Sequence, residues 1–182
     1  MAKLVAKTYG EALFKLAMEE NRGDEFLQEV EEIRAILKDN PEFDKLMLHP
    51  GVPREEKLKL VEQVFKGRAS DEMTGLLEIV IRKERYKDLQ NIFQYFIDQM
   101  KEEKRIGIAY VTTAVELTQA QKDAVKAKLL KTTSYRTMEM HYQVEPEIIG
   151  GMVIRIKDRV VDSSIRTKLN DLTKQLLQIQ LG

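Results

Sequence analysis

Two histidines are the first residues to consider for chemistry, because histidine is the side chain best suited to acid–base work near neutral pH. His49 lies in a turn rich in proline and glycine, and His141 lies on the polar side of a predicted strand. Neither stands at a spacing that pairs it with a nucleophile or a second metal ligand. The chain has no cysteine, which excludes thiolate catalysis and cysteine-ligated metals. We therefore expect no catalytic residue, no metal and no cofactor.

The pair Gly150-Gly151 is the one motif that suggests a phosphate-binding loop. It lacks the spacing of such loops, and a predicted strand follows it where a helix would be needed. A bulge or tight turn explains the pair better. A hydrolase that uses Asp158 or Asp162 remains an alternative, although no histidine or metal set converges on these carboxylates.

The overall composition is that of a folded protein with a balanced surface. The 182 residues are 43% hydrophobic and 33% charged, and 30 basic side chains offset 30 acidic ones. A zero net charge argues against a dedicated nucleic-acid binder. No apolar run approaches the ~18 residues that span a bilayer, and the start lacks the apolar core of a signal peptide. We expect a soluble, cytoplasmic protein whose membrane association goes through partners.

Helical periodicity dominates residues 1–105 and predicts a bundle of about six helices joined by short turns. The second helix is predicted to end at Asn40-Pro41, because the residue before proline is disfavoured in a helix. Ser70 is predicted to cap the fifth helix. The first and fifth helices have apolar stripes wider than a small bundle needs. Such a helix is either central or shared with a partner, and the pattern leaves both options open.

Residues 106–182 are predicted to form a small α+β domain. A strand over 108–115 leads to a helix that begins after Thr118, with Gln121 completing a capping box. Strict alternation over 137–144 predicts a strand with one wet face. A β-hairpin follows, with Lys157-Asp158 as its two-residue turn. The class is therefore α+β: an N-terminal helical bundle, then a small C-terminal domain.

A long helix is predicted to end the chain, with Asp162 as its cap. Its apolar residues Ile165, Leu169, Leu172, Leu176 and Ile179 are spaced 4, 3, 4 and 3 apart. This is the spacing of the seam along which two helices pack.

The order of segments resembles the delta subunit of F-type ATP synthases, the oligomycin sensitivity-conferring protein family. Ala6 to Phe14 is similar to the family's opening motif, and Leu76-Leu77 with Arg85 and Leu89 is similar to its leucine-rich stretch. The most specific stretches are Ile148 to Ile154 and Asp158 to Ile165. The chain departs from the family at two positions. Gly10 replaces the usual alanine, at a helix cost of ~1 kcal/mol, and Lys157 replaces the usual turn glycine.

The resemblance implies that residues 1–105 bind the N-terminal helix of the alpha subunit, in a groove between the first and fifth helices. The implied contacts are Tyr9, Ala12, Leu13, Leu16, Leu76, Leu77, Val80 and Ile81. A charge at Leu77 is expected to test this groove. The resemblance also implies that residues 106–182 bind the C-terminal end of the b stalk, with Leu169, Leu172, Leu176 and Ile179 as candidate contacts. Packing on their own sheet is an equally good account of these four residues.

The function implied is that of a non-enzymatic connector in the peripheral stalk. It would hold the catalytic head to the stator against rotor torque and so couple proton translocation to ATP synthesis. We expect a peripheral membrane protein on the cytoplasmic side of the bacterial cell membrane, monomeric when isolated, with no nucleic-acid partner. The alternative is a helical adaptor unrelated to the synthase.

Overall fold

The computed structural model describes the backbone of residues 2–180 and the side chains of residues 3–177. The chain divides into two compact units, residues 1–100 (unit 1) and 101–182 (unit 2). The predicted boundary at residue 105 lies just beyond this division. Of the described helices, none is long and apolar enough to cross a bilayer.

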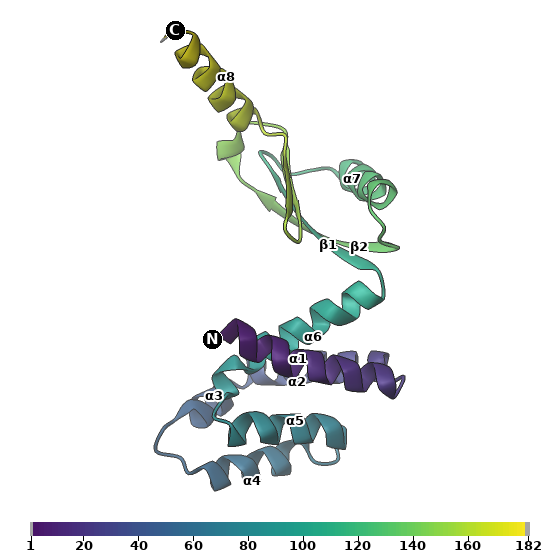
Figure 1. The fold of residues 1–182 in the computed structure, drawn as a ribbon, viewed down its shortest axis with the longest axis vertical. Coiled ribbons are helices and arrows are strands. Elements are labelled where there is room, and N and C mark those ends of the chain that lie inside the picture. Colours follow the sequence, from purple (N-terminus) through teal and green to yellow (C-terminus); the bar gives the residue numbers. More distant parts are fainter. Residues whose placement is uncertain (1, 181–182) are drawn as a thin grey trace. The chain divides into compact units, whose positions relative to one another are not determined.

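Unit 1 is built from six α-helices and one short 3-10 helix, in agreement with the predicted bundle (Figure 1). The helices are α1 (Ala2–Glu19), α2 (Gly23–Asp39), α3 (Pro41–Leu48), α4 (Arg54–Phe65), α5 (Asp71–Arg82) and α6 (Leu89–Glu103), with η1 (Tyr86–Asp88) before α6. Pro41 is the first residue of α3, where its missing N–H costs nothing. Ser70 caps α5, as predicted, by accepting from the Met73 N–H at 3.3 Å.

One hydrophobic core joins the helices of unit 1, and its centre consists of Phe26, Phe93 and Phe96, each 0% exposed. Gly10 explains how α1 comes so close to α6. A Cβ atom at this position would lie 2.7 Å from Cδ1 of Tyr95 and 3.0 Å from the carbonyl oxygen of Ile92. The glycine that departs from the family pattern is therefore required by local packing.

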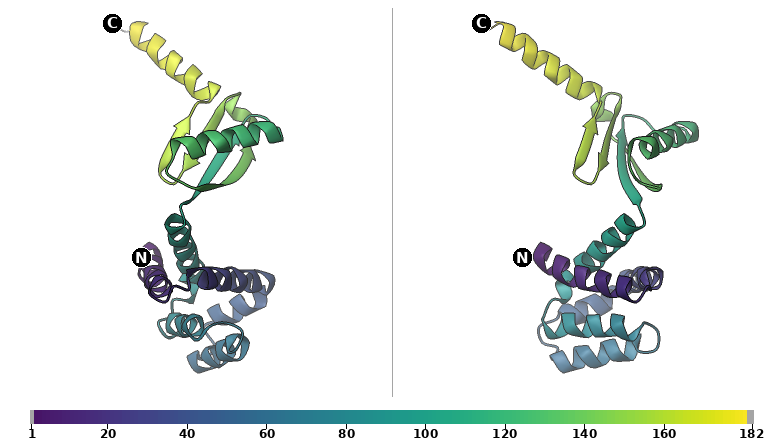
Figure 2. Two further views of the ribbon diagram at one scale, coloured as in Figure 1. Left: turned by 90° about the vertical axis from the view of Figure 1, so that its right-hand side faces the viewer. Right: turned by 45° about the vertical axis from the view of Figure 1, so that its right-hand side comes forward.

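Unit 2 contains a four-stranded sheet in the order β2-β1-β3-β4. Its strands are β1 (Ile106–Thr113), β2 (Thr137–Val144), β3 (Met152–Ile156) and β4 (Arg159–Asp162). β1 and β2 are parallel, and α7 (Gln119–Thr132) makes the crossover that parallel strands need. α7 lies against one face of the sheet in both views of Figure 2. Tyr142 of β2 donates to the carbonyl of Lys122 in α7 at 3.2 Å, which fixes that contact.

The remaining elements of unit 2 are η2 (Pro146–Ile148) and the final helix α8 (Ile165–Gln180). The capping box of α7, Thr118 with Gln121, forms as predicted. The start of α8 differs from the prediction that Asp162 is its cap. Ser164 directly precedes the helix, and its Oγ accepts from the Thr167 N–H. Asp162 lies two residues earlier and accepts from the Ser164 N–H and the Thr167 hydroxyl, both at 2.8 Å. Together these elements give the predicted α+β architecture.

Candidate docking surfaces

The eight residues expected to face an outside helix separate into two groups. Leu13, Leu77, Val80 and Ile81 are at most 4% exposed and belong to the core of unit 1. Their side chains are covered by their own chain, so they support the surface from beneath. Tyr9, Leu16 and Leu76 are half-buried, and Ala12 is exposed. These four can be reached by a partner.

Four accessible apolar residues of α1 form one stripe. Val5, Tyr9, Ala12 and Leu16 are spaced 4, 3 and 4 apart, so they lie along one side of the helix. On α5, the half-buried Leu76 is followed by Ile79, which is 47% exposed. Val5 and Ile79 were not among the expected contacts. The signal for them was present in the sequence, because both belong to the wide apolar stripes. We call these six residues the α1–α5 surface.

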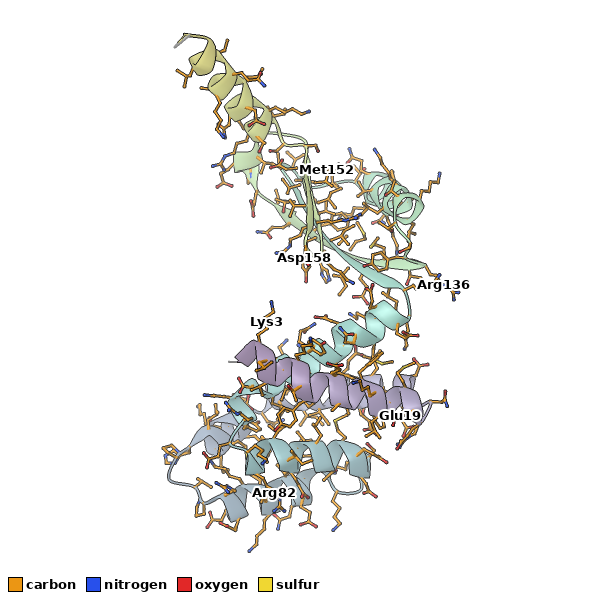
Figure 3. All side chains as sticks on the ribbon, viewed as in Figure 1. Lys3, Glu19, Arg82, Arg136, Met152 and Asp158 are labelled. Atoms are coloured by element: carbon orange, nitrogen blue, oxygen red, sulfur yellow. The ribbon has the colours of Figure 1, made fainter. Side chains whose placement is uncertain are left out.

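α1 and α5 run alongside each other in Figures 1 and 2. A salt bridge of 3.3 Å between Arg22, just after α1, and Glu72, in the first turn of α5, joins their neighbouring ends. Figure 3 places Lys3 and Arg82 toward one end of the pair and Glu19 at the other, so the two helices are antiparallel. The α1–α5 surface therefore belongs to two adjacent helices fixed in one arrangement.

Arg22 is the centre of a polar cluster at this corner of unit 1. Its guanidinium donates to both carboxylate oxygens of Glu25, at 2.9 and 2.7 Å, and to Glu20 at 2.8 Å. The hydrogen bonds to Glu25 and Glu20 raise the pKa of Arg22. The hydrogen bond between Arg22 and Glu25 also lowers the pKa of Glu25. The pKa of Glu72 is lowered by its own backbone N–H and by Arg22. Arg22, Glu25 and Glu72 therefore stay charged at neutral pH.

A second contact ties the start of α5 to α2. The carboxylate of Glu29 accepts from the Ser70 hydroxyl at 2.7 Å and from the Ser70 backbone N–H at 3.2 Å. Because Ser70 is also the cap of α5, this contact fixes the direction in which the helix leaves the corner. The two contacts place α5 against both α1 and α2.

The second candidate surface is α8, which exposes its apolar seam. Ile165, Leu169, Leu172 and Leu176 are 42%, 50%, 55% and 63% exposed. The structure therefore disfavours the account in which these leucines pack on their own sheet. The side chain of Ile179, the last expected contact, lies outside the described residues. Leu177, 55% exposed, was not expected and widens the apolar side of the helix. We call the first four residues the α8 stripe.

The expected turn residues lie at two tight corners of unit 2. Lys157 begins the hairpin turn with a positive φ of 51°, so the chain accepts there a conformation usually given to glycine. Its ammonium pairs with Glu102. Gly151 has φ 76°, and a Cβ there would lie 2.4 Å from the carbonyl oxygen of Ser163. Gly150 accepts from the Ile165 N–H at 2.9 Å, which attaches the start of α8 to this corner.

The residues considered for chemistry have structural roles. His49 accepts from the Gly51 N–H at 3.0 Å, and His141 stacks on Tyr110 with ring centroids 5.0 Å apart. Asp162, considered above for hydrolysis, is engaged at the start of α8. Within the described residues, no three His, Asp or Glu side chains are grouped so as to hold a metal ion. The molecule thus offers apolar surface on helices.

Known proteins resemble this chain along almost its whole length. The family model for the ATP synthase delta (OSCP) subunit matches residues 5–176. The chain is 50% identical over 182 residues to the ATP synthase subunit delta of Lachnoclostridium phytofermentans, covering 100% of both chains. It is 32% identical over 173 residues to the ATP synthase subunit delta of Halalkalibacterium halodurans, covering 95% of this chain and 94% of the relative. A chain of the Toxoplasma gondii mitochondrial ATP synthase hexamer has the same fold, with a TM-score of 0.75 at 22% identity and coverage of 94% and 97%.

Proposed function

Because the chain belongs to the ATP synthase delta (OSCP) subunit family, we propose that it ties the catalytic head of the enzyme to its stator through two separate docking surfaces. The family is a non-catalytic component of the peripheral stalk, so the expectation of a chain that is not an enzyme is confirmed. Membership also excludes the alternative of an adaptor unrelated to the synthase. The subunit is peripheral to the complex, and we propose that it lies on the cytoplasmic side of the membrane.

The observation that carries this proposal is the exposed α8 stripe. Four apolar side chains at heptad spacing, 42–63% exposed, are costly in water unless another surface covers them. Heptad spacing matches a partner that is itself a long helix, because each side chain inserts between four residues of the facing helix. We assign the C-terminal end of the b stalk to this stripe.

For unit 1 we propose that the α1–α5 surface receives the amphipathic N-terminal helix of an alpha subunit. The accessible residues alternate with supporting core residues, so an incoming helix meets a firm base. Binding of this kind depends on apolar area removed from water, worth roughly 25 cal/mol per Å² before the costs of association. No covalent chemistry is required to resist the torque of the rotor.

Reconstitution tests the proposal. Synthase from the same organism, stripped of its delta subunit, is expected to hydrolyse ATP without coupling hydrolysis to proton movement. Addition of this chain should restore proton-driven ATP synthesis and leave the rate of hydrolysis by the free head unchanged. A chain that binds neither the alpha subunit nor the b stalk in this assay would refute the connector role.

A further inference from the structure

We infer that the helix received by the α8 stripe carries acidic side chains on both sides of its own apolar residues, and that these acids face Arg166 and Lys168. The inference rests on the proposed function. It gives the docked segment of the b stalk a required chemistry, and it fixes the level along α8 at which the acidic side chains lie.

Arg166 and Lys168 flank the α8 stripe close to its first residues. Because successive residues of an α-helix turn by about 100°, Arg166 lies on one side of the stripe and Lys168 on the other. In the heptad pattern set by the stripe these are the e and g positions, from which charged side chains reach the neighbouring helix and determine partner choice and orientation. A helix seated on the stripe therefore passes between the two cations.

Neither cation is neutralised within unit 2. Both residues are exposed, and among the described residues neither has a hydrogen-bond or ion-pair partner. Asp162 precedes the helix, where its carboxylate accepts from a backbone N–H and a hydroxyl at the start of α8. Asp171, the one acidic residue of α8, occupies an outer position of the heptad. The stripe thus offers two positive charges and no negative charge along its edges.

The charge is confined to one level of the stripe. Farther along α8, the two flanking positions are Thr173 and Gln175, which carry no charge. Lys174, the remaining cation of the helix, lies on the opposite side from the stripe. A docked helix therefore needs its acidic side chains opposite the start of α8 and polar ones beyond it. A second copy of α8 cannot supply them, because none of its flanking positions is acidic.

These two charges are unfavourable for α8 on its own. The amino end of a helix favours acidic side chains, and both α2 and α5 begin with two of them. α8 has none in its first turn, where Arg166 and Lys168 stand instead. Departures from local rules of this kind are expected at functional positions. The carboxylates of a docked helix would relieve the cost.

Charge reversal in the full chain tests the inference, and the probe is a synthetic peptide of the C-terminal segment of the b stalk from the same organism. Arg166→Glu and Lys168→Glu should each weaken peptide binding about tenfold in isothermal titration at about 0.1 M salt, and the loss should shrink as salt is raised. The melting temperature should not fall, because the first turn of a helix favours a carboxylate. A loss of stability alongside the loss of affinity would overturn the inference, because it would assign these cations to the fold.

Lys174→Glu is the matched control, because it makes the same change of charge in the same helix on the side away from the stripe. It should leave the affinity within a factor of about two. A second peptide, with the acidic residues beside its apolar stripe changed to lysine, should bind the variant Arg166→Glu/Lys168→Glu more tightly than it binds the wild type.

The outcomes separate this inference from the function on which it rests. Binding of the natural peptide that is equal in Lys168→Glu and the wild type, or equally weakened in Lys168→Glu and Lys174→Glu, would overturn the acidic flanks and leave the b-stalk site in place. Absence of any binding by the wild type, or a dimer of the chain held through α8 in analytical ultracentrifugation, would overturn the b-stalk site and the flanks with it.

Discussion

The α1–α5 surface and the α8 stripe present apolar residues in opposite ways. In unit 1 every helix contributes buried apolar residues to one core, and the accessible residues are the edge of that core. α8 keeps its apolar seam in solvent. The first surface is therefore the edge of a folded core, whereas the second leaves its apolar side chains in water within this chain.

The difference follows from how much each unit can bury. The core of unit 1 includes three fully buried phenylalanines. In the described part of unit 2 the buried apolar side chains are Ala109, Val111, Met138 and Ile148, three of which come from the sheet that α7 covers. The α8 stripe takes no part in either core.

The largest expected effect is on the α8 stripe. Leu172→Asp places a charge at the middle of the seam, where docking would remove it from water. We expect binding to the C-terminal segment of the b stalk to weaken at least about a hundredfold, or ~3 kcal/mol. The melting temperature should not change, because Leu172 is 55% exposed. Isothermal titration and calorimetry measure the two quantities.

Asn170→Asp is the matched control for this change. It adds the same charge to the same helix at nearly the same level, but on a different side of the helix from the seam. It should leave b-stalk affinity within a factor of about two. If both variants weakened b-stalk binding equally, the net charge of α8 would determine the affinity and its apolar stripe would not.

The neighbouring leucines of α5 test the preformed surface. Leu76 is half-buried, so Leu76→Asp should weaken binding of the alpha-subunit peptide about thirtyfold, or ~2 kcal/mol, with a small loss of stability. Leu77 is 2% exposed, so Leu77→Asp buries a charge and should unfold unit 1. Circular dichroism and peptide titration separate the outcomes. A folded Leu77→Asp variant that still binds would contradict the assignment of core and surface.

Substitutions at two glycines test how closely the helices of unit 1 are packed. Gly75→Ala in α5 meets open space and should stabilise the protein by about 1 kcal/mol through helix propensity. Gly10→Ala gains the same propensity, but its Cβ would lie 2.7 Å from Tyr95. We expect it to fall about 2 kcal/mol below Gly75→Ala in chemical denaturation. Tyr95→Ala should reduce that difference without abolishing it, because the carbonyl oxygen of Ile92 stays 3.0 Å from the new Cβ.

The smallest effect concerns the start of α8. The N–H of Ser164, its side chain and the hydroxyl of Thr167 lower the pKa of Asp162. Its stabilising effect is therefore present above the ordinary aspartate range near 3.9 and is lost as pH falls through the lower folded value. Between pH 5 and about 2, the wild type should lose slightly more helix than Asp162→Asn does. Identical acid titrations would show that this cap is not needed by α8.

Sequence patterns predict most of this fold because its elements carry strong local signals. The span of β2 matches its alternating residues, and the caps at Ser70 and Thr118 form as their residue types indicate. The sequence could not predict which apolar residues of α1 and α5 are accessible and which are buried. Leu76 and Leu77 are adjacent and identical in type, and only the packing of α5 against its neighbours decides which one is covered. The stripe of α8 was predictable as a pattern, but its exposure depends on the rest of unit 2.

The contacts at the start of α5 bear on how unit 1 would withstand a sustained pull. The carboxylate of Glu29 accepts two hydrogen bonds from Ser70, and Arg22 forms a salt bridge with Glu72. The first turn of α5 is therefore held to α2 and to the segment that follows α1. A force along the axis of α5 would stretch these contacts at the same time. It would not break them one after another. Contacts that share a load in this way must break together before the start of the helix can move.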